Sequence, residues 1–360
     1  MPGDRAGRSG RSAKVIHHLP IHARTVSDTP TALVLSPPNG RRFAPALSYR
    51  GMTTSSSEPP AGGLTDLSKL IYGTTRLGDD KIPFADRVMM AHTAMDAGLW
   101  FHTSHQYGDA LKVLRAAFDA DPKRIPRMIF KVGWSSIEEL RRTIRLNIEP
   151  LGVDHMDIGQ LCLGGKLAEE FASGGKCYDD FRTLRDEGLV HRFVLEVFPW
   201  TSTVPLQALR PGYPNGVVDG YIFYLNPLQR FASNELWDLL QERGEPIVAM
   251  RTVAGGDIHR LRDVSGGAWK DYLRQRAVEV APLYERSGCK TWPEFCVRFA
   301  YGFPQVRATV GATSRPENLC ALLDAVKIIK PLPKDIQLEI IGLQYRWSDE
   351  TDGHAEPWSM

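Results

Sequence analysis

The sequence predicts an α/β protein built as a single closed (β/α)8 (TIM) barrel, for three reasons. Short β-branched and aromatic runs alternate with amphipathic segments from residue 67 to about residue 330, which is typical of a parallel sheet. Eight such units in about 260 residues match the size of a closed barrel. An open doubly wound sheet would carry a GxGxxG turn after its first strand, whereas Gly73 stands alone in YGTTRLG.

Four strand and helix units predict the first half of the barrel. The strands are short, mainly apolar runs, and the helices have apolar residues at helical spacing and end at glycines such as Gly98 and Gly188. Ser136 is placed to cap the third helix, whose first turn contains Glu138 and Glu139. The expected strands are 69–74, 99–103, 128–132 and 156–163, and the expected helices are 85–97, 110–118, 136–151 and 178–187.

The second half repeats this scheme. The runs VVDGYIFYL, PIVAM and VRATV are predicted to be strands, because β-branched and aromatic residues favour a pleated, buried surface. The expected strands are 190–198, 217–225, 246–250 and 306–310, and the expected helices are 204–209, 234–243, 271–286, 293–301 and 316–327. The barrel is therefore assigned to 67–330, and residues 331–360 to a C-terminal helix and tail.

Residues 1–66 are predicted to be a disordered basic tail outside the barrel. The segment is rich in Arg, Ser, Pro and Gly and has little helical or strand periodicity, a composition that buries little apolar surface. Its first 60 residues contain eight Lys and Arg but only three Asp and Glu, so the remainder of the chain is slightly acidic. We interpret Met52 as the native start and the residues before it as an upstream extension; a basic targeting peptide is the alternative.

Composition excludes several classes of function. The barrel has no basic patch of the kind that binds nucleic acid, and no run approaches the roughly 18 apolar residues of a membrane helix. The chain has 5 cysteines, without CxxC pairing or metal-ligand spacing to histidine, which favours a reducing, cytoplasmic environment and predicts no metal site. We expect a cytoplasmic protein with a small-molecule substrate, monomeric or homodimeric, with no nucleic-acid or membrane partner.

Candidate functional residues lie where the predicted strands end, since the chemistry of such barrels is at the carboxyl ends of the strands. Tyr107 lies in the loop after the second strand, and Lys131 lies at the end of the third strand. The residues at the strand ends are His102, Lys131, Cys162, Glu196, Asn226, Arg251 and Gly311.

Eight segments, in the order of the strands, resemble the aldo-keto reductases. The clearest are GTTRLG, FHTSHQYGDA, IFKVGW, EPLGVDHMDIGQLCL and LRDEGLVHRF, followed by LNPLQR, AMRTVAGG and TVGATSRPENL. Together they span about 67–327. The resemblance implies NADP(H)-linked reduction or oxidation of a small carbonyl or sugar-like substrate by a tetrad of Asp, Tyr, Lys and His.

This sequence keeps half of that tetrad. Tyr107 matches the proton-donating tyrosine and Lys131 the lysine that activates it, whereas His102 stands for the aspartate and Cys162 for the histidine. A neutral His102 can accept a hydrogen bond from Lys131, while a charged one would repel it. A thiol is a weak donor and orients a carbonyl poorly. His105 is the candidate replacement for a missing group.

The cofactor contacts that the resemblance implies are only partly kept. Gly311, Ser314 and Arg315 in GATSR resemble the family's phosphate-binding loop, and Arg315 is placed to meet a 2′-phosphate. At the nicotinamide end, Glu196, Val197 and Phe198 replace a Gly-x-Ser-Asn segment, Ile222 replaces a glutamine, and Met250 replaces a stacking aromatic. Arg251 is a candidate anion contact, and Asn226 ends the sixth strand nearby.

Three interpretations follow. The first is a divergent reductase that still uses NADP(H). The second is a family-derived enzyme with non-redox chemistry (a lyase, epimerase or dehydratase), in which Lys131 forms a Schiff base, Cys162 and His102 form a thiolate–imidazolium pair, or Glu196 acts as a base. The third is a non-catalytic barrel, since two tetrad positions are replaced.

Overall fold

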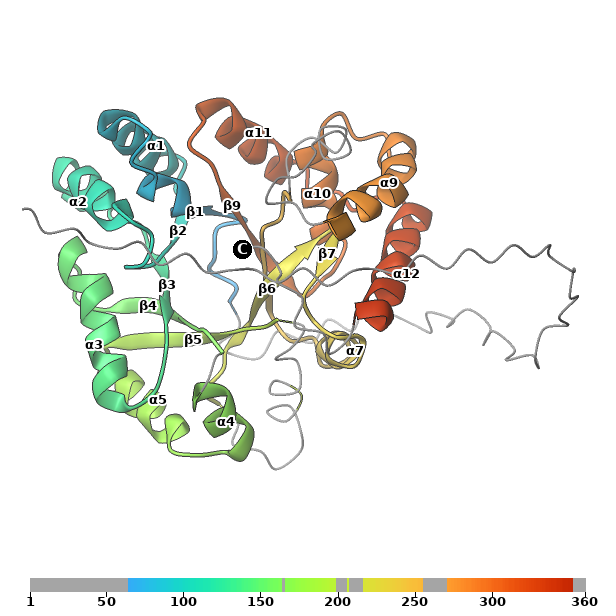
Figure 1. Ribbon diagram of the computed structural model, residues 1–360. Helices are drawn as coiled ribbons and strands as arrows, with labels where there is room; N and C mark the ends of the chain where they lie inside the picture. The colour runs from blue at the N-terminus through green and yellow to red at the C-terminus, as the bar shows by residue number, and fades with distance from the viewer. Residues whose placement is uncertain (1–63, 164–165, 199–205, 207–215, 255–270, 352–360) are drawn as a thin grey trace, which may run out of the picture. The chain divides into compact units, whose positions relative to one another are not determined.

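The computed structural model describes residues 64–163, 166–198, 206, 216–254 and 271–351 (Figure 1). The chain divides into two units, Met1–Ser57 and Glu58–Met360, and every described helix and strand belongs to the second. The tail expected over 1–66 therefore lies almost wholly outside the described residues. The same is true of the helix expected at 204–209, apart from Leu206.

Eight parallel strands close into a barrel, as the sequence predicts. Neighbouring strands pair in sequence order from β1 to β6, then β6 with β8 and β8 with β9, and the β1–β9 pair completes the ring. The strands are β1 (Leu70–Gly73), β2 (Trp100–Thr103), β3 (Met128–Val132), β4 (Met156–Leu161), β5 (Val190–Glu196), β6 (Gly220–Asn226), β8 (Ile247–Met250) and β9 (Val306–Ala312).

The helices surround the strands (Figure 1). Ser136 caps α3 by accepting a hydrogen bond from the Glu139 backbone, as expected, and side chains of Ser233 and Thr291 cap α7 and α10 in the same way. The helices are α1 (Phe84–Asp96), α2 (Ala110–Ala120), α3 (Ile137–Ile148), α4 (Lys166–Ser173), α5 (Cys177–Asp186), α7 (Asn234–Arg243), α9 (Asp271–Arg286), α10 (Trp292–Ala300), α11 (Pro316–Lys327) and α12 (Lys334–Thr351). Among the described helices, none is both long enough and apolar enough to cross a membrane.

Several expected boundaries are wrong, and one α-helix and one short strand were not predicted. The third helix ends at Ile148 and continues as a 3-10 turn, Glu149–Leu151, because Pro150 lacks the N–H of an α-helical bond. The strands expected to run to residues 163 and 198 end at 161 and 196, and the one expected from 217 begins at 220. Helix α4 was missed, as was β7 (Gln229–Arg230), which pairs antiparallel with β6.

Apolar side chains fill the barrel interior from alternate positions along each strand. Because side chains of a strand alternate between its two faces, Ile129, Ile158 and Val194 point inward, while Phe130 and Phe193 pack against the helices. The inner core consists of Leu64, Leu67, Ile71, Trp100, Ile129, Ile158, Val194, Ile222, Val248, Met250, Ala308 and Val310. On a strand whose last inward core residue is followed by two more residues, the second of these therefore faces the mouth of the barrel.

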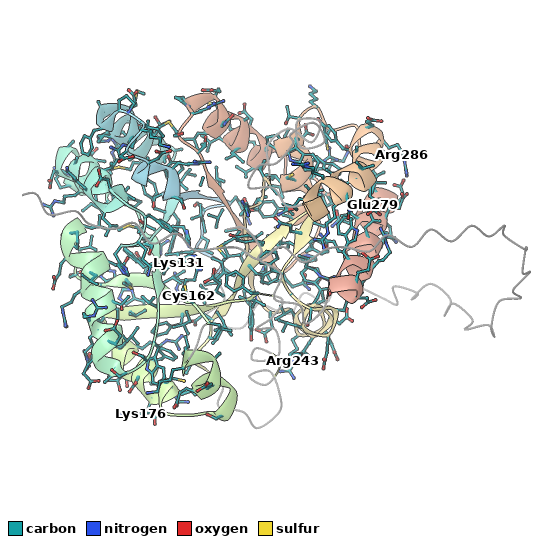
Figure 2. The ribbon with its side chains drawn as sticks, in the orientation of Figure 1. Lys131, Cys162, Lys176, Arg243, Glu279 and Arg286 are labelled. Atoms are coloured by element: carbon teal, nitrogen blue, oxygen red, sulfur yellow. The ribbon has the colours of Figure 1, made fainter. Side chains whose placement is uncertain are left out.

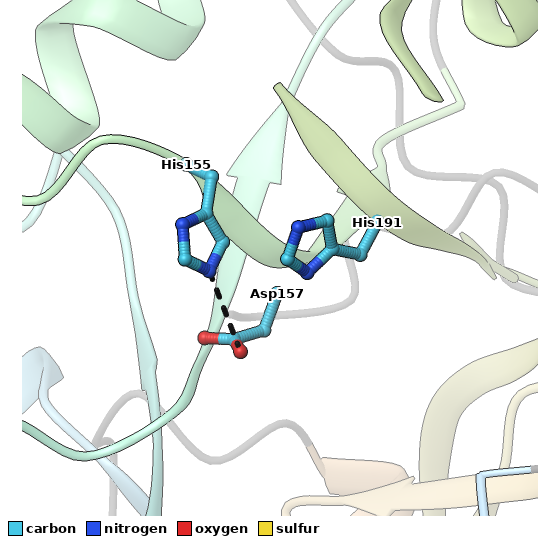
Figure 3. A group of neighbouring side chains, drawn as sticks. All are labelled: His155, Asp157 and His191. Carbon is cyan, nitrogen blue, oxygen red and sulfur yellow. Dashed lines mark ion pairs between the residues drawn. The ribbon is translucent and has the colours of Figure 1, made fainter. Parts of the chain in front are cut away.

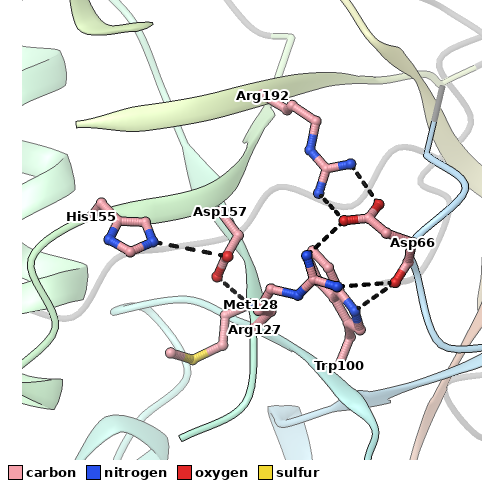
Figure 4. Close-up of polar contacts among 7 residues, drawn as sticks. All are labelled: Asp66, Trp100, Arg127, Met128, His155, Asp157 and Arg192. Carbon is pink, nitrogen blue, oxygen red and sulfur yellow. Dashed lines mark hydrogen bonds and ion pairs between the residues drawn. The ribbon is translucent and has the colours of Figure 1, made fainter. Parts of the chain in front are cut away.

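An ion-pair cluster closes the amino-terminal end of the barrel (Figure 4). The Asp66 carboxylate accepts hydrogen bonds from Arg127 at 2.7 Å and from Arg192 at 2.6 and 3.0 Å. The Trp100 ring lies beside both guanidinium groups, 4.4 Å from that of Arg127 and 5.5 Å from that of Arg192. This cluster joins the segment before β1 to β3 and β5.

We expect Asp66→Asn to destabilise the protein at neutral pH and to matter less in acid. Burial raises the pKa of the Asp66 carboxyl. The hydrogen bond and charge of Arg192 and the charge of Arg127 lower it by more, so the pKa lies below its usual value of 3.8. A depressed carboxyl pKa contributes stability above the unfolded value and loses it as pH falls through the folded value. The loss at pH 7 should be about 1 kcal/mol, since solvent screens a partly exposed pair.

Urea unfolding at pH 7 and pH 3 measures this difference. The gap in unfolding free energy between wild type and variant should narrow in acid, as the pH falls toward the lowered pKa of Asp66. Asp324→Asn, which removes an exposed carboxylate paired with Lys327, serves as the matched control and should change little at either pH. An equal gap at both pH values would show that the Asp66 charge does not stabilise the barrel.

Candidate active site

Alternation along the strands brings a layer of polar side chains to the carboxyl-terminal mouth of the barrel. Two positions beyond the inward core residues Trp100, Ile129, Ile158, Val194 and Ile222 come polar residues. These are His102, Lys131, Gln160, Glu196 and Tyr224. Sequence reasoning identified three of them and missed Gln160 and Tyr224, although the same alternation would have found both. Lys131 and Cys162, labelled beside each other in Figure 2, are near enough to interact electrostatically.

Lys131 and Glu196 form a largely buried ion pair across the mouth. The Lys131 Nζ lies 3.4 Å from the Glu196 Oε1, and their side chains are 19% and 3% exposed. Burial is the largest single influence and lowers the pKa of Lys131, but the charge of Glu196 and the smaller contributions of the neighbouring side chains together raise it by more. The net shift is therefore upward and the ammonium is stable. Glu196 on β5 thus supplies the lysine's negative partner, which the resemblance had placed at position 102 on β2.

Tyr107 completes the group around Lys131. Burial of the hydroxyl raises its pKa; the Lys131 charge and a hydrogen bond with Thr75 lower it, while Glu196 raises it again, and the net shift is upward. The phenol is therefore protonated at neutral pH and is available as a proton donor. Gly78 lets this loop pack closely, since a Cβ there would lie 1.9 Å from the Tyr107 carbonyl oxygen, which gives a physical reason for the last glycine of GTTRLG.

His102 is a buried, neutral neighbour of this group. Its Nε2 lies 2.6 Å from the Gln160 Oε1, so this ring nitrogen carries the proton and donates it to the amide oxygen. Burial lowers the pKa of His102 to about 4, the Lys131 charge acts in the same direction, and the hydrogen bond with Gln160 opposes both. The ring centroid lies 6.3 Å from that of Tyr107. His102 therefore stands near the phenol without adding a charge.

Cys162 interacts with both charged groups but is not poised as a nucleophile. Burial raises the pKa of its thiol well above the usual range, and the Glu196 charge raises it further, while Lys131 opposes the shift. A protonated thiol beside a neutral imidazole does not form a thiolate–imidazolium pair. These directions give no support to the charged pair between Cys162 and His102 that the sequence allowed.

His105 makes its described contacts with α3 instead of the Lys131 pair. Its backbone N–H donates to the Asn147 Oδ1 at 2.7 Å, and its Nδ1 lies 3.2 Å from the Asn147 Nδ2. The same amide group lies 3.4 Å from the Lys131 carbonyl oxygen. Asn147, which sequence reasoning missed, therefore links the loop of His105 and Tyr107 to the end of β3.

Asn226 and Arg251 form the opposite wall of the mouth. The Asn226 amide donates to the Arg251 carbonyl oxygen at 3.1 Å, and its Oδ1 accepts from the Leu228 backbone at 2.9 Å, so its side chain shapes the turn. Arg251 has a φ of 50°, which is strained for a residue with a Cβ. Its guanidinium lies 5.3 Å from the centre of the Tyr224 ring.

The loop after β9 fits a phosphate group. Gly311 lets β9 approach α11, because a Cβ there would lie 2.7 Å from Leu322. Ser314 is half-buried and Arg315 exposed, and no side chain caps the N-terminus of the 12-residue helix α11. A helix N-terminus with an adjacent arginine attracts phosphate.

At the nicotinamide end the chain offers different groups. Ile222 and Met250, which replace the family's amide and aromatic contacts, belong to the inner core. The half-buried Tyr224 ring stacks on Phe231, with centroids 4.4 Å apart, and packs against the same inner core. The loop after β9 therefore offers groups of the kind that hold a phosphate, whereas the positions of the family's nicotinamide contacts are occupied by core side chains.

A closed (β/α)8 barrel with a tyrosine and a buried lysine at its carboxyl mouth defines the class of protein. The sequence model of the Aldo/keto reductase family matches residues 69–338. The chain belongs to the aldo/keto reductase family, which confirms the resemblance drawn from the motifs. No curated protein matches the sequence.

Solved structures show the same fold at low identity. An aldo-keto reductase from Bacillus halodurans in its holo form is 20% identical, with a TM-score of 0.60, over 78% of this chain and 94% of that one. One from Klebsiella pneumoniae in complex with NADPH is 16% identical, with a TM-score of 0.59, over 78% of this chain and 92% of that one. At these identities the likeness establishes the fold alone.

Proposed function

We propose that the protein is an NADP(H)-dependent oxidoreductase that reduces a small carbonyl or sugar-like compound, or oxidises the corresponding alcohol. The Lys131–Glu196 pair beside Tyr107 carries this proposal. In this family the proton-donating tyrosine needs a charged lysine beside it, and a buried carboxylate keeps the lysine charged. We further propose that the protein is cytoplasmic and acts as a monomer or homodimer.

In this reaction each residue has a defined role. NADPH, when bound, supplies the hydride that reduces the carbonyl carbon. Tyr107 donates its phenolic proton to the carbonyl oxygen, and the Lys131 ammonium stabilises the phenolate that remains. Glu196 keeps Lys131 charged and in place. His102 and Cys162 line the mouth as neutral groups, and neither is assigned a proton transfer.

The cofactor is proposed to bind with its phosphate groups at the loop after β9. Ser314, Arg315 and the N-terminus of α11 would hold the 2′-phosphate, while Gly311 keeps strand and helix close together. Arg251 is a candidate contact for a second negative group, and its backbone is held by Asn226. The nicotinamide would lie near Tyr224 and the Lys131–Glu196 pair.

NADPH should raise the midpoint of thermal unfolding, because a ligand that binds only the folded protein stabilises it. At a hundredfold excess over the dissociation constant, the gain is about 2.7 kcal/mol, or about 5 °C for a domain of this size. Arg315→Ala should weaken NADPH binding while leaving NADH binding nearly unchanged. Arg307→Ala, on the same strand and helix unit, is the matched control.

Two outcomes separate the redox proposal from its alternatives. If millimolar NADPH leaves the melting temperature and the tryptophan fluorescence unchanged, the redox function is wrong. The same barrel would then perform non-redox chemistry (as a lyase, epimerase or dehydratase) or bind ligands without catalysis. If NADPH binds but Arg315→Ala has no effect, the protein still uses the cofactor, and the assigned phosphate site is wrong.

A further inference from the structure

Two histidines and an aspartate meet at the amino-terminal end of the barrel, opposite to the candidate active site. His155 directly precedes β4, Asp157 is its second residue, and His191 is the second residue of β5. Strands β4 and β5 pair here with Met156 opposite Val190. One ligand atom of each of the three side chains lies within 4.8 Å of the other two, and Figure 3 shows the two rings beside each other near the carboxylate.

Hydrogen bonds on the outside of this cluster leave its inner atoms facing one another. The His155 Nδ1 lies 2.6 Å from the Asp154 Oδ1, so this nitrogen carries a proton and the lone pair of Nε2 is directed elsewhere. That Nε2 lies 3.9 Å from the Asp157 Oδ1, while the Asp157 Oδ2 accepts the Met128 N–H at 2.9 Å (Figure 4). Two acceptors that face each other favour a cation between them.

The second histidine adds a further nitrogen ligand on the same side. The rings of His155 and His191 are stacked, with centroids 4.3 Å apart and planes inclined by 29°. His191 is exposed and Asp157 is 16% exposed, so an ion can reach the cluster from solvent. Burial contributes little to holding the two partly exposed imidazole rings together, whereas an ion bound to both rings would do so.

The donor set selects the class of ion. Two imidazole nitrogens and one carboxylate oxygen suit zinc and its neighbours in the first transition series, and do not suit calcium or magnesium, which take oxygen ligands. Tetrahedral zinc with bonds of about 2.0–2.2 Å places its ligand atoms about 3.4 Å apart. Side-chain rotation of the exposed His191 would close the present separation. Asp154 provides the carboxylate that commonly orients a zinc-bound histidine.

We propose that His155, Asp157 and His191 bind a divalent transition-metal ion of the zinc type, with water completing the coordination. The ion would bridge β4 and β5 at the end of the barrel where residues serve stability. The sequence predicted no metal site, because that prediction searched for spacing between cysteine and histidine. These three ligands instead come together through the pairing of two strands.

Isothermal titration of the full chain with zinc chloride tests the site. Wild type should bind one more zinc ion than His191→Ala, and zinc should raise the thermal midpoint of wild type more than that of the variant. Asp154→Ala should keep the site but weaken binding about tenfold, through loss of the orienting hydrogen bond. Cobalt(II), whose visible absorption reports its ligands, should lose its histidine-dependent bands in His155→Ala.

Controls separate this site from other zinc ligands in the chain. The triple variant His17→Ala/His18→Ala/His22→Ala and the exposed-thiol variant Cys320→Ser should retain the additional ion. Equal zinc stoichiometry and affinity in wild type and His191→Ala would overturn the proposal. So would the absence of zinc binding to the wild-type protein at a zinc concentration of about 1 mM, which is far above what protein zinc sites need. NADPH stabilisation should be the same in wild type and His191→Ala, so the test is independent of the proposed oxidoreductase function.

Discussion

Tyr107→Phe is expected to lower the rate of carbonyl reduction by about 10²–10⁴, the contribution of a positioned proton donor. Phenylalanine keeps the ring and its packing but has no proton to donate. Binding of NADPH and the thermal midpoint should change little, since the hydroxyl is not required for the core. Single-turnover measurement of NADPH oxidation checks this loss in the chemical step.

The pH profile adds a second readout for Tyr107. Its pKa is shifted above 10.0, chiefly by burial, so the donor is protonated throughout the neutral range. The rate of reduction should therefore be independent of this group below pH 9 and should decline only in more alkaline solution. Tyr301→Phe, which removes a hydroxyl bonded to the Lys69 carbonyl at the other end of the barrel, is the control. If Tyr107→Phe retains the wild-type rate, the assigned proton donor is wrong.

Glu196→Gln is expected to reduce both activity and stability, because it leaves the Lys131 ammonium buried without its carboxylate. Removing one partner of a buried pair costs about 3–5 kcal/mol, and the partial exposure of Lys131 reduces this to about 2–3 kcal/mol. Burial then dominates and lowers the pKa of Lys131. The rate of reduction should fall, and its alkaline limit should move to lower pH, since Lys131 loses its proton earlier.

The effect of pH on stability has a definite sign. The pKa of Lys131 is raised above 10.5 in the folded protein, so the pair contributes fully below that value and is lost as pH rises through the folded pKa. The stability gap between wild type and Glu196→Gln should thus be largest at neutral pH and should narrow in alkaline solution, where Lys131 loses its proton first in the variant. Urea unfolding at three pH values measures it.

Two further variants make this experiment specific. Glu187→Gln breaks an exposed pair with Arg141 and should leave both rate and pH profile unchanged. In a double-mutant cycle with Lys131→Met, the combined variant should be more stable than the sum of the two single losses predicts. Additive losses would show that Glu196 and Lys131 act independently, and the counterion assignment would then be wrong.

Local pattern in the sequence was sufficient to predict the eight strands of the barrel. The period-two alternation that puts Ile129 inward also puts Lys131 at the mouth, and glycines and caps mark most helix ends. The motif around Tyr107 placed it in the correct loop. Strand boundaries were less accurate, because apolar residues continue beyond the last paired residue of β4 and β5.

Contacts between distant strands could not be predicted in the same way. Lys131 and Glu196 are 65 positions apart, and whether they meet depends on the register of β4 between them. The partner of His105 is Asn147, which lies on helix α3, 42 positions away. Its place there depends on how the helix packs, which periodicity alone does not determine. The β7 pairing likewise depends on the turn built by Asn226.

The closed ring of strands has a consequence for how such proteins are compared. Every strand of the ring ends at the same mouth and can place a side chain there. A chemical group can therefore come from a different position in the sequence and still lie at the same place in the structure. Position 102 has no carboxylate, yet the lysine retains one from β5. A sequence comparison that shows a replaced residue at one position therefore does not show that the chemical group is lost, because another strand can supply that group to the mouth of the barrel.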